Sequence, residues 1–334
     1  MKIIEYRIYA PLTMEEFPLS QRYVGAKAST ENSGDGEGVE VILNEPYEKD
    51  GHMGRHTITH LHIASKTPSY IRRLLPRDAL IVIEECWDCF PYTKSVYKNL
   101  WLKDRLGLIT ETIHAPGVSN LENPTHLSPE DLKKRKVDII DIALPMKKSK
   151  EYKCDVDPSV FHSEKTNRGP LKPGWWKQQA NGQKQNGSGP SPSGTPISPT
   201  SDTQSPNPSD ETQEPLPVTT AHKVAKFWFR VPGLSTIAEN FAAGVLKSIY
   251  EGAIRQQFCW IDEWYGMTEA EISAYEHGEI AKQKDCLLED QVSFSDNDDE
   301  DGLVRSPVDQ EEPLPVANHE MQSPSFFEDE IVPL

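Results

Sequence analysis

An α+β domain, in which an antiparallel sheet wraps around one long helix, is the fold class that the sequence predicts. Between residues 39 and 115, runs of β-branched and apolar residues are separated by prolines and glycines, as in successive strands. Further along, large apolar residues recur every fourth position from Ile237 to Ile249, which is the spacing of one helix face. Many strands beside a single long helix favour a sheet that curves around that helix.

The first elements expected are a strand, "IIEYRIYA", and a helix that begins near "LTMEEF". Thr13 and Glu16 have the spacing of a capping box, in which each residue satisfies a free backbone N–H of the first turn. On this helix Gln21 falls in line with Phe17 and Val24, so a polar residue interrupts an apolar face. Taken alone, Gln21 is most simply a glutamine at the edge of the helix.

The remaining elements follow from the same two patterns. A second capping box, Thr236 with Glu239, marks the start of the long helix, and Thr268 with Glu271 marks a shorter helix after it. Strands are expected at 39–46, 56–65, 79–90, 92–101, 106–115 and 222–231.

Composition divides the 334 residues into folded and unfolded parts. Residues 181–217 contain eight prolines and no aromatic residue, and therefore cannot bury enough apolar surface to offset the entropy of ordering. We expect one domain formed by residues 1–180 and 218–285, with 181–217 a disordered insertion and 286–334 a disordered acidic tail.

Charge and cysteine content limit the possible partners and compartments. The net charge is −17, and residues 285–334 carry −14 of it (15 Asp and Glu against one Arg), so the domain itself is nearly neutral. Nucleic-acid binding, which needs a clustered basic face, is not expected. The sequence has neither the apolar core of a signal peptide nor a run of about 20 apolar residues. Five scattered cysteines suit a reducing cytosol, and we expect a cytoplasmic monomer.

The stretch "IVIEECWDCFPYTKS" contains Cys86 and Cys89 in a C-x-x-C spacing. In a strand these two side chains point to opposite faces, and about 10 Å separates their Cα atoms. A disulfide needs less than about 7 Å, and a zinc site needs both thiolates directed to one point. Two cysteines packed as small apolar residues are therefore the preferred interpretation. His60 and His62 are an alternative metal pair, but no third ligand is evident, and no metal is expected.

Several blocks of the sequence, in the same order, resemble the phosphatidylinositol transfer protein family. They are "EYRIYAPLTMEEF", "GEGVEVILNEPYEKD", "SKTP", "CWDCFPYTKS", "EYKCDVDPSVFHSEKTNRGPL" and "FCWIDEW". The resemblance implies a helix-grip, START-like fold that encloses one phospholipid as cargo, needs no cofactor and exchanges the lipid between membranes. It implies no enzyme, and no Ser/His/Asp or Cys/His arrangement in the sequence supports one. A lipid-sensing module of the same fold that does not shuttle lipid remains the alternative.

The resemblance also implies which residues bind the lipid. The phosphate-binding positions of the family all carry hydrogen-bond donors here: Gln21, Thr57, Ser95, Thr112 and Lys223. The head-group positions have changed. Where the family has threonine, lysine, asparagine and glutamate to read inositol, this sequence has Thr57, Thr59, Asp88 and His277, and a shift of one residue would bring in Glu276. Thr93 stands where the family has a cysteine linked to choline lipids.

Docking and regulatory positions are further expectations of the resemblance. At the membrane-docking loop, Val231 and Pro232 replace a tryptophan pair, and Pro76 belongs to the same surface. Trp175 and Trp176 either take over part of this role or pack on the core. Ser163 occupies a regulatory phosphorylation site. In the tail, Phe326 and Phe327 weakly resemble the motif that binds VAP-type proteins of the endoplasmic reticulum.

Overall fold

The computed structural model describes residues 1–31, 38–49, 51–63, 76–145, 156–183, 215–230 and 235–295. Its centre is a sheet of eight strands in the order β2-β3-β4-β5-β6-β8-β1-β7. The strands are β1 (Lys2–Ala10), β2 (Gly38–Lys49), β3 (His52–His62), β4 (Ile81–Cys89), β5 (Tyr92–Lys98), β6 (Leu106–Pro116), β7 (Lys136–Ile140) and β8 (Thr219–Phe229).

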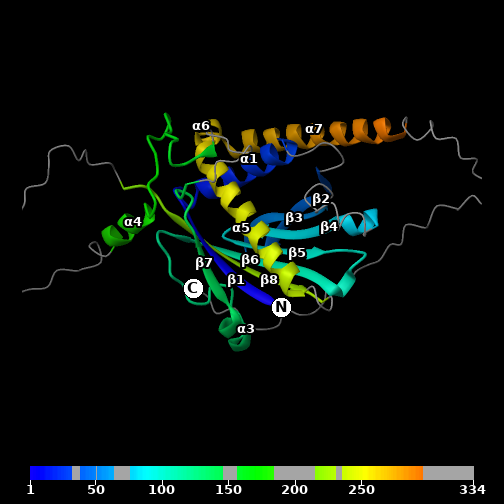
Figure 1. Cartoon of the computed structure of the whole chain (residues 1–334). Helices are drawn as coiled ribbons and strands as arrows, with labels where there is room; N and C mark the ends of the chain where they lie inside the picture. The colour runs from blue at the N-terminus through cyan, green and yellow to red at the C-terminus, as the bar shows by residue number, and fades with distance from the viewer. Residues whose placement is uncertain are drawn as a thin grey trace, which may run out of the picture. The chain divides into compact units, whose positions relative to one another are not determined.

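Figure 1 shows α5 running across one face of the sheet, with α1, α6 and α7 grouped beyond its C-terminal end. Residues of α5 contact β8 and β1. The helices are α1 (Glu16–Glu31), α3 (Pro129–Lys134), α4 (Trp176–Gln183), α5 (Ser235–Cys259), α6 (Ile261–Trp264) and α7 (Glu269–Ser295), with short 3₁₀ turns η1 (Arg77–Leu80) and η2 (Lys103–Arg105). The predicted α+β, helix-grip class is confirmed.

Two of the three predicted capping boxes form. Glu16 N donates to Thr13 Oγ1 over 3.2 Å, and Thr13 N donates to Glu16 Oε2 over 2.9 Å. Thr268 and Glu271 pair in the same reciprocal way. The predicted box of Thr236 with Glu239 was wrong. Helix α5 begins at Ser235, which places Thr236 inside the helix, and the Glu239 carboxylate lies 3.3 Å from the N-terminal amine of Met1.

Several predicted boundaries also differ from the structure. Helix α7 was expected to be short and has 27 residues, two more than α5. It continues to Ser295, past the expected start of the tail at 286, and α4 continues to Gln183, past the expected start of the insertion at 181. The rest of both segments lies outside the described residues, apart from 215–217. Residues Met1–Ser293 form one compact unit.

Strand β7 was not predicted. It pairs with β1 in parallel, Tyr6 opposite Asp138, whereas every other neighbouring pair in this sheet is antiparallel. Its five residues are too few for a clear alternation pattern, and two of them, Val137 and Ile139, remain exposed at the sheet edge. The packed core lies between β1, β8, α1 and α5, where Tyr6 and Phe258 are almost fully buried.

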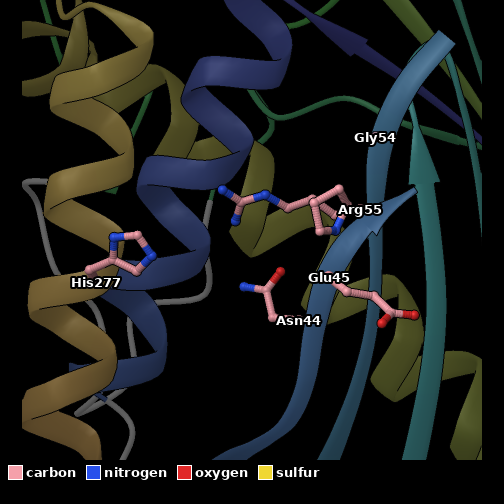
Figure 2. A pocket seen from close by; sticks show the side chains of 6 residues that line it. Asn44, Glu45, Gly54, Arg55 and His277 are labelled. Carbon is pink, nitrogen blue, oxygen red and sulfur yellow. The ribbon is translucent and has the colours of Figure 1, made fainter. Parts of the chain in front are cut away.

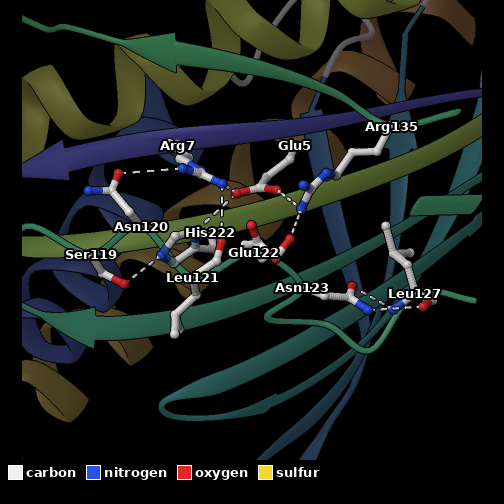
Figure 3. A network of polar contacts seen from close by, with 10 residues as sticks. All are labelled: Glu5, Arg7, Ser119, Asn120, Leu121, Glu122, Asn123, Leu127, Arg135 and His222. Atoms are coloured by element: carbon white, nitrogen blue, oxygen red, sulfur yellow. Dashed lines mark hydrogen bonds and ion pairs between the residues drawn. The ribbon is translucent and has the colours of Figure 1, made fainter. Parts of the chain in front are cut away.

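A buried charge network lies on the outer face of β1 and β8 (Figure 3). Glu5 is fully buried, and its carboxylate accepts hydrogen bonds from Arg7 Nε (2.6 Å) and Arg135 Nη1 (2.5 Å). The His222 ring bridges Glu5 (3.1 Å) and Ser119 Oγ (3.0 Å). Both oxygens of the Glu5 carboxylate therefore have partners, which is the condition under which a buried carboxylate is tolerated.

Glu5→Gln should destabilise the protein by about 3 kcal/mol at pH 7, because it leaves two guanidinium groups without their shared counter-charge. Burial opposes ionisation of Glu5, but His222, Arg7 and Arg135 outweigh it, so the pKa of Glu5 lies below its ordinary value of 4.5. A lowered pKa in the folded state stabilises the fold above the unfolded-state pKa, and this contribution disappears as pH falls through the folded pKa. Urea unfolding should therefore show the difference between wild type and variant shrinking below about pH 4.5. The exposed Glu164→Gln is the matched control; equal losses in both variants would contradict the role of the network.

Candidate lipid phosphate and head-group site

The side chains predicted to bind phosphate lie on the inward face of the sheet, beneath α5. Strand register places Asp88, Thr93, Thr112 and Lys223 directly opposite one another across β4, β5, β6 and β8. Since alternate residues share a face, these four side chains form one continuous polar row.

A second row runs beside the first. Thr57, Cys86, Ser95 and Thr110 are opposite one another across β3, β4, β5 and β6. Of this row, Ser95 and Thr110 are buried. The structure thus brings the four sheet residues of the predicted phosphate set, Thr57, Ser95, Thr112 and Lys223, onto two neighbouring rows.

Lys223 lies deep under α5, with its Nζ 4.7 Å from the ring centroid of Tyr250. Burial lowers the pKa of Lys223, while the acidic groups of Cys86, Glu84 and Asp88 oppose that shift. An ammonium group desolvated in this way is stabilised when an anion is placed beside it.

Three buried hydroxyl groups on this side of the sheet have no hydrogen-bond partner among the residues that the structure describes. They are Thr59 Oγ1, Thr112 Oγ1 and Tyr250 OH. An unsatisfied buried hydroxyl costs about 1–3 kcal/mol, so such groups are expected where a ligand supplies the partner. Thr112 lies opposite Lys223 in the strand pairing. A cation and a hydroxyl group that can donate a hydrogen bond are therefore next to each other.

Gln21 reaches the first row from α1. Its Nε2 donates to Asp88 Oδ2 over 3.3 Å, and Thr93 Oγ1 donates to Asp88 Oδ1 over 2.6 Å. The polar interruption in the apolar stripe of α1 is therefore directed at the predicted site. Asp88, Thr93 and Gln21 act as one hydrogen-bonded group at the end of the row.

His277 lies at the same end of the sheet as Asp88, in a pocket of about 210 Å³ (Figure 2). Figure 2 shows Asn44 and Arg55 directed toward α1 and α7, while Glu45 points away. Arg55 is opposite Asp88 in the register. Gly54 permits this close pairing, because a Cβ there would lie 2.1 Å from the Asp88 carbonyl oxygen.

Glu276, the alternative head-group residue on α7, already has partners within the protein. It accepts from Arg22 over 2.5 Å and lies 3.2 Å from Arg55, so it joins α7 to α1 and β3. Sequence reasoning missed Arg55, and it also missed Glu84 and Tyr250. The spacing Glu84, Cys86, Asp88 could have identified Glu84, since the three alternate on one face of β4.

Of the two alternatives for Trp175 and Trp176, the structure favours packing on the core. Trp175 is 5% exposed, and Trp176 stacks on Tyr9 with ring centroids 4.1 Å apart, so both pack on the core and are not free to enter a membrane. Pro76 is exposed. Val231 and Pro232 lie outside the described residues, as do Phe326 and Phe327.

Ser163 is fully buried in this structure. Its hydroxyl donates to Asp262 Oδ1 over 2.5 Å and accepts from the Thr166 backbone N–H over 3.0 Å. A kinase would have to open this contact, and the added phosphate would then repel the Asp262 carboxylate.

The cysteines fit the packing interpretation. Cys86 lies on the inward face, and burial, aided by Glu84, raises its pKa to about 12, so it is a neutral thiol near pH 7. Cys89 is buried, with its thiol 2.9 Å from the His52 carbonyl oxygen. His60 and His62 both lie 3.6 Å from Glu40, but the described part of the chain contains no group of three or more such residues that could hold a metal.

Cys86→Ala combined with Cys89→Ala should therefore keep lipid transfer close to wild type, with some loss of stability from the removed packing. Metal analysis of the purified wild-type protein should find no stoichiometric zinc. Zinc at one equivalent that disappears in the double variant would contradict this interpretation.

The comparisons with known proteins agree with this geometry. The family model for phosphatidylinositol transfer protein matches residues 1–280. Phosphatidylinositol transfer protein 1 of Dictyostelium discoideum is 35% identical over 276 residues, covering 83% of this chain and 92% of the relative. The beta isoform of Bos taurus is 35% identical over 82% of this chain and 90% of its own length. The cytoplasmic phosphatidylinositol transfer protein 1 of Drosophila melanogaster is 35% identical over 85% of this chain and 91% of its own length.

The fold and the family match together define a lipid carrier of the helix-grip type. The chain belongs to the phosphatidylinositol transfer protein family, whose members are lipid transfer proteins and not enzymes. Within the described residues, none of the helices has the length and apolar character needed to cross a membrane.

Proposed function

We propose that this protein binds one glycerophospholipid between the sheet and α5 and exchanges it between membranes. The observation that carries the proposal is Lys223, which is half-buried and lies opposite Thr112, whose buried hydroxyl has no hydrogen-bond partner among the described residues. A phosphate that leaves water needs charged and hydroxyl donors. Thr57 and Ser95 supply hydroxyl groups in the neighbouring row, and Gln21 reaches Asp88 in the same row as Lys223.

The acyl chains would lie against α5. Ile237, Phe241, Val245 and Ile249 form one stripe of this helix and are 68%, 57%, 39% and 57% exposed. This stripe is offset from the side of α5 that carries Ala243, Leu246 and Tyr250, which packs on the core. Covering four large apolar side chains with hydrocarbon removes about 1.5–3 kcal/mol of unfavourable exposure for each side chain that becomes fully buried.

We further propose that phosphatidylcholine is carried at least as well as phosphatidylinositol. Thr59, Asp88 and His277 stand where the family reads the inositol ring, and Thr93 stands at the position linked to choline lipids. A carboxylate at Asp88 favours a cationic head group by Coulomb attraction and repels a bare phosphate monoester.

Native mass spectrometry of the purified protein tests the carrier directly, since one bound glycerophospholipid per chain is expected and its mass identifies the head group. Movement of labelled phosphatidylcholine and phosphatidylinositol from donor to acceptor vesicles then separates a carrier from a lipid sensor. A protein that holds lipid but moves none of it would favour the sensor.

The cellular setting is part of the proposal. The protein would work as a monomer in the cytosol and meet membrane surfaces transiently, through Pro76, Val231 and Pro232. Phe326 and Phe327 would bind a VAP-type protein. Replacing both phenylalanines with alanine should then abolish capture of this protein by that partner. Phosphorylation of Ser163 would regulate the cycle by opening its contact with Asp262.

A further inference from the structure

The turn between β5 and β6 presents two large apolar side chains to solvent. Leu100 is 65% exposed and Trp101 is 50% exposed. Neither residue belongs to the docking positions that the family resemblance implies. An exposed tryptophan next to an exposed leucine is uncommon on a free surface and marks an interaction site when its surroundings are polar.

The buried side chain of Asn99 fixes the backbone conformation of this turn. Asn99 is 3% exposed, and its Nδ2 donates to the carbonyl oxygens of Ala79 (3.0 Å) and Ile81 (2.9 Å). Its Oδ1 accepts from the backbone N–H groups of Trp101 (3.2 Å) and Leu102 (2.9 Å). One buried side chain thus fixes the backbone that carries both apolar residues, so their exposure is a feature of an ordered turn.

The turn lies at the end of the sheet where α5 and its exposed apolar stripe begin. Arg230 N donates to the Arg105 carbonyl oxygen over 2.6 Å, which joins the turn to the last described residue before 231–234. Helix α5 begins at Ser235, and its exposed stripe starts with Ile237. Figure 1 shows the end of β5, the start of β6 and the start of α5 at the same end of the sheet, near the N-terminus.

Basic side chains surround the two apolar residues. Lys103, Arg105 and Arg230 are exposed, and the side chain of Lys98 is 63% exposed. Among the described side chains around this turn, the acidic groups are Asp104 and Glu85, the latter 3.6 Å from Lys98 Nζ. Four cations against two carboxylates make this a basic patch on a chain whose net charge is −17.

We propose that Leu100 and Trp101, surrounded by these four basic residues, form a membrane-docking surface for a bilayer that contains anionic phospholipid. Tryptophan prefers the membrane interface, and basic residues are attracted to anionic lipid surfaces. The turn supplies at β5–β6 the aromatic anchor that Val231 and Pro232 do not supply. This inference rests on the proposed transfer function.

A second copy of the chain fits this surface less well. Two apolar side chains bury far less than the roughly 1,000 Å² that a specific protein interface needs. Like-charged rims would also face each other in a symmetric pair, which is unfavourable. An anionic bilayer, in contrast, meets both the apolar centre and the basic rim.

The test is flotation of the full chain with vesicles of phosphatidylcholine, with and without phosphatidylserine. Leu100→Ala with Trp101→Ala should weaken partitioning at least about tenfold, since two large apolar side chains no longer enter the interface. Val160→Ala with Tyr265→Ala is the matched control, because these residues are 60% and 38% exposed and lie away from the turn. The control should bind as wild type does, and both variants should melt at the wild-type temperature.

A second variant tests the basic rim. Lys98→Gln, Lys103→Asn and Arg105→Gln together should remove most of the preference for phosphatidylserine, by roughly fivefold for each cation. Asparagine is chosen at Lys103 because φ is +47° there, a region that asparagine tolerates.

Equal partitioning of wild type and the Leu100/Trp101 variant would overturn the docking surface, as would a loss of the same size in the control. A dimer that dissociates in this variant, measured by light scattering, would assign the surface to a second copy and also overturn it. Lipid loading is followed separately by native mass spectrometry. Wild type that floats with vesicles and loads lipid but transfers none would count against the proposed transfer function and leave the docking surface standing.

Discussion

Lys223→Ala should weaken binding of every glycerophospholipid about 10- to 100-fold, because a hydrogen bond between charged groups contributes roughly 1.5–3 kcal/mol and 1.4 kcal/mol is tenfold. The reason lies in what these lipids share. All carry a phosphodiester, and Lys223 is the cation at the β8 end of the first polar row, opposite Thr112 and beneath Tyr250. The loss should therefore be the same for phosphatidylcholine and phosphatidylinositol in a vesicle transfer assay.

Lys226→Ala is the matched control for this variant. Lys226 lies three residues further along β8, where alternation places its side chain on the outer face, with Nζ 3.3 Å from Asp131 Oδ2. Transfer by this variant should equal that of wild type. Lys223→Ala should also melt at or above the wild-type temperature, because removing a buried cation removes a desolvation penalty. Normal transfer by Lys223→Ala, or equal losses in both variants, would refute the assignment of the phosphate site.

Local patterns predicted the parts of the fold that local interactions determine. The boxes at Thr13 and Thr268 form through contacts within four residues, and the antiparallel strands follow the alternation that one buried face imposes. The box at Thr236 is equally local and did not form, because Glu239 pairs instead with the distant N-terminal amine of Met1. Strand β7 was missed because its pairing with β1 joins residues more than 130 positions apart. The Trp176 side chain gave no sign of burial, since its stacking partner, Tyr9, is equally distant in sequence.

The residues of the candidate site likewise include some that the sequence pattern reveals and others that only the structure brings together. Gln21 could be singled out from the sequence, because a polar residue in an apolar stripe is visible without coordinates, but its partner Asp88 could not. Lys223 gave no sign of its place under α5, because basic residues recur irregularly along the sequence of this strand. The register of β6 against β8 is what places it beside Thr112. Tyr250 was missed because its position depends on how α5 crosses β8.

The triple change Thr59→Lys, Asp88→Asn, His277→Glu should raise phosphatidylinositol transfer selectively. Each lost head-group hydrogen bond is worth roughly 1 kcal/mol if neutral and up to about 3 kcal/mol if charged, so restoring three could shift preference by two or more orders of magnitude. The structure supports each change. Thr59 Oγ1 is buried without a partner and stands opposite Glu84, whose carboxylate would balance an introduced ammonium. His277 already lines the pocket beside Arg55.

At Asp88 the change removes a charge and re-orients a neighbour. An asparagine there can still accept from Thr93 Oγ1, but its amide group would face Gln21 Nε2, a donor. Gln21 would therefore turn its amide, and both side chains would offer donors and acceptors, as a ring of hydroxyl groups requires.

The double variant Thr59→Lys with Asp88→Asn separates the two candidate carboxylate positions on α7. If Glu276 is the head-group reader, this double variant should gain as much phosphatidylinositol transfer as the triple, because Glu276 is already present. If position 277 is the reader, only the triple variant should gain phosphatidylinositol transfer.

In both cases, wild type should carry phosphatidylcholine at least as well as phosphatidylinositol in the same competition assay, because the phosphate donors serve both lipids and Asp88 favours a cationic head group. Wild-type protein that transfers phosphatidylinositol strongly and undiminished by competing phosphatidylcholine would show that residues other than Thr59, Asp88 and His277 read the ring.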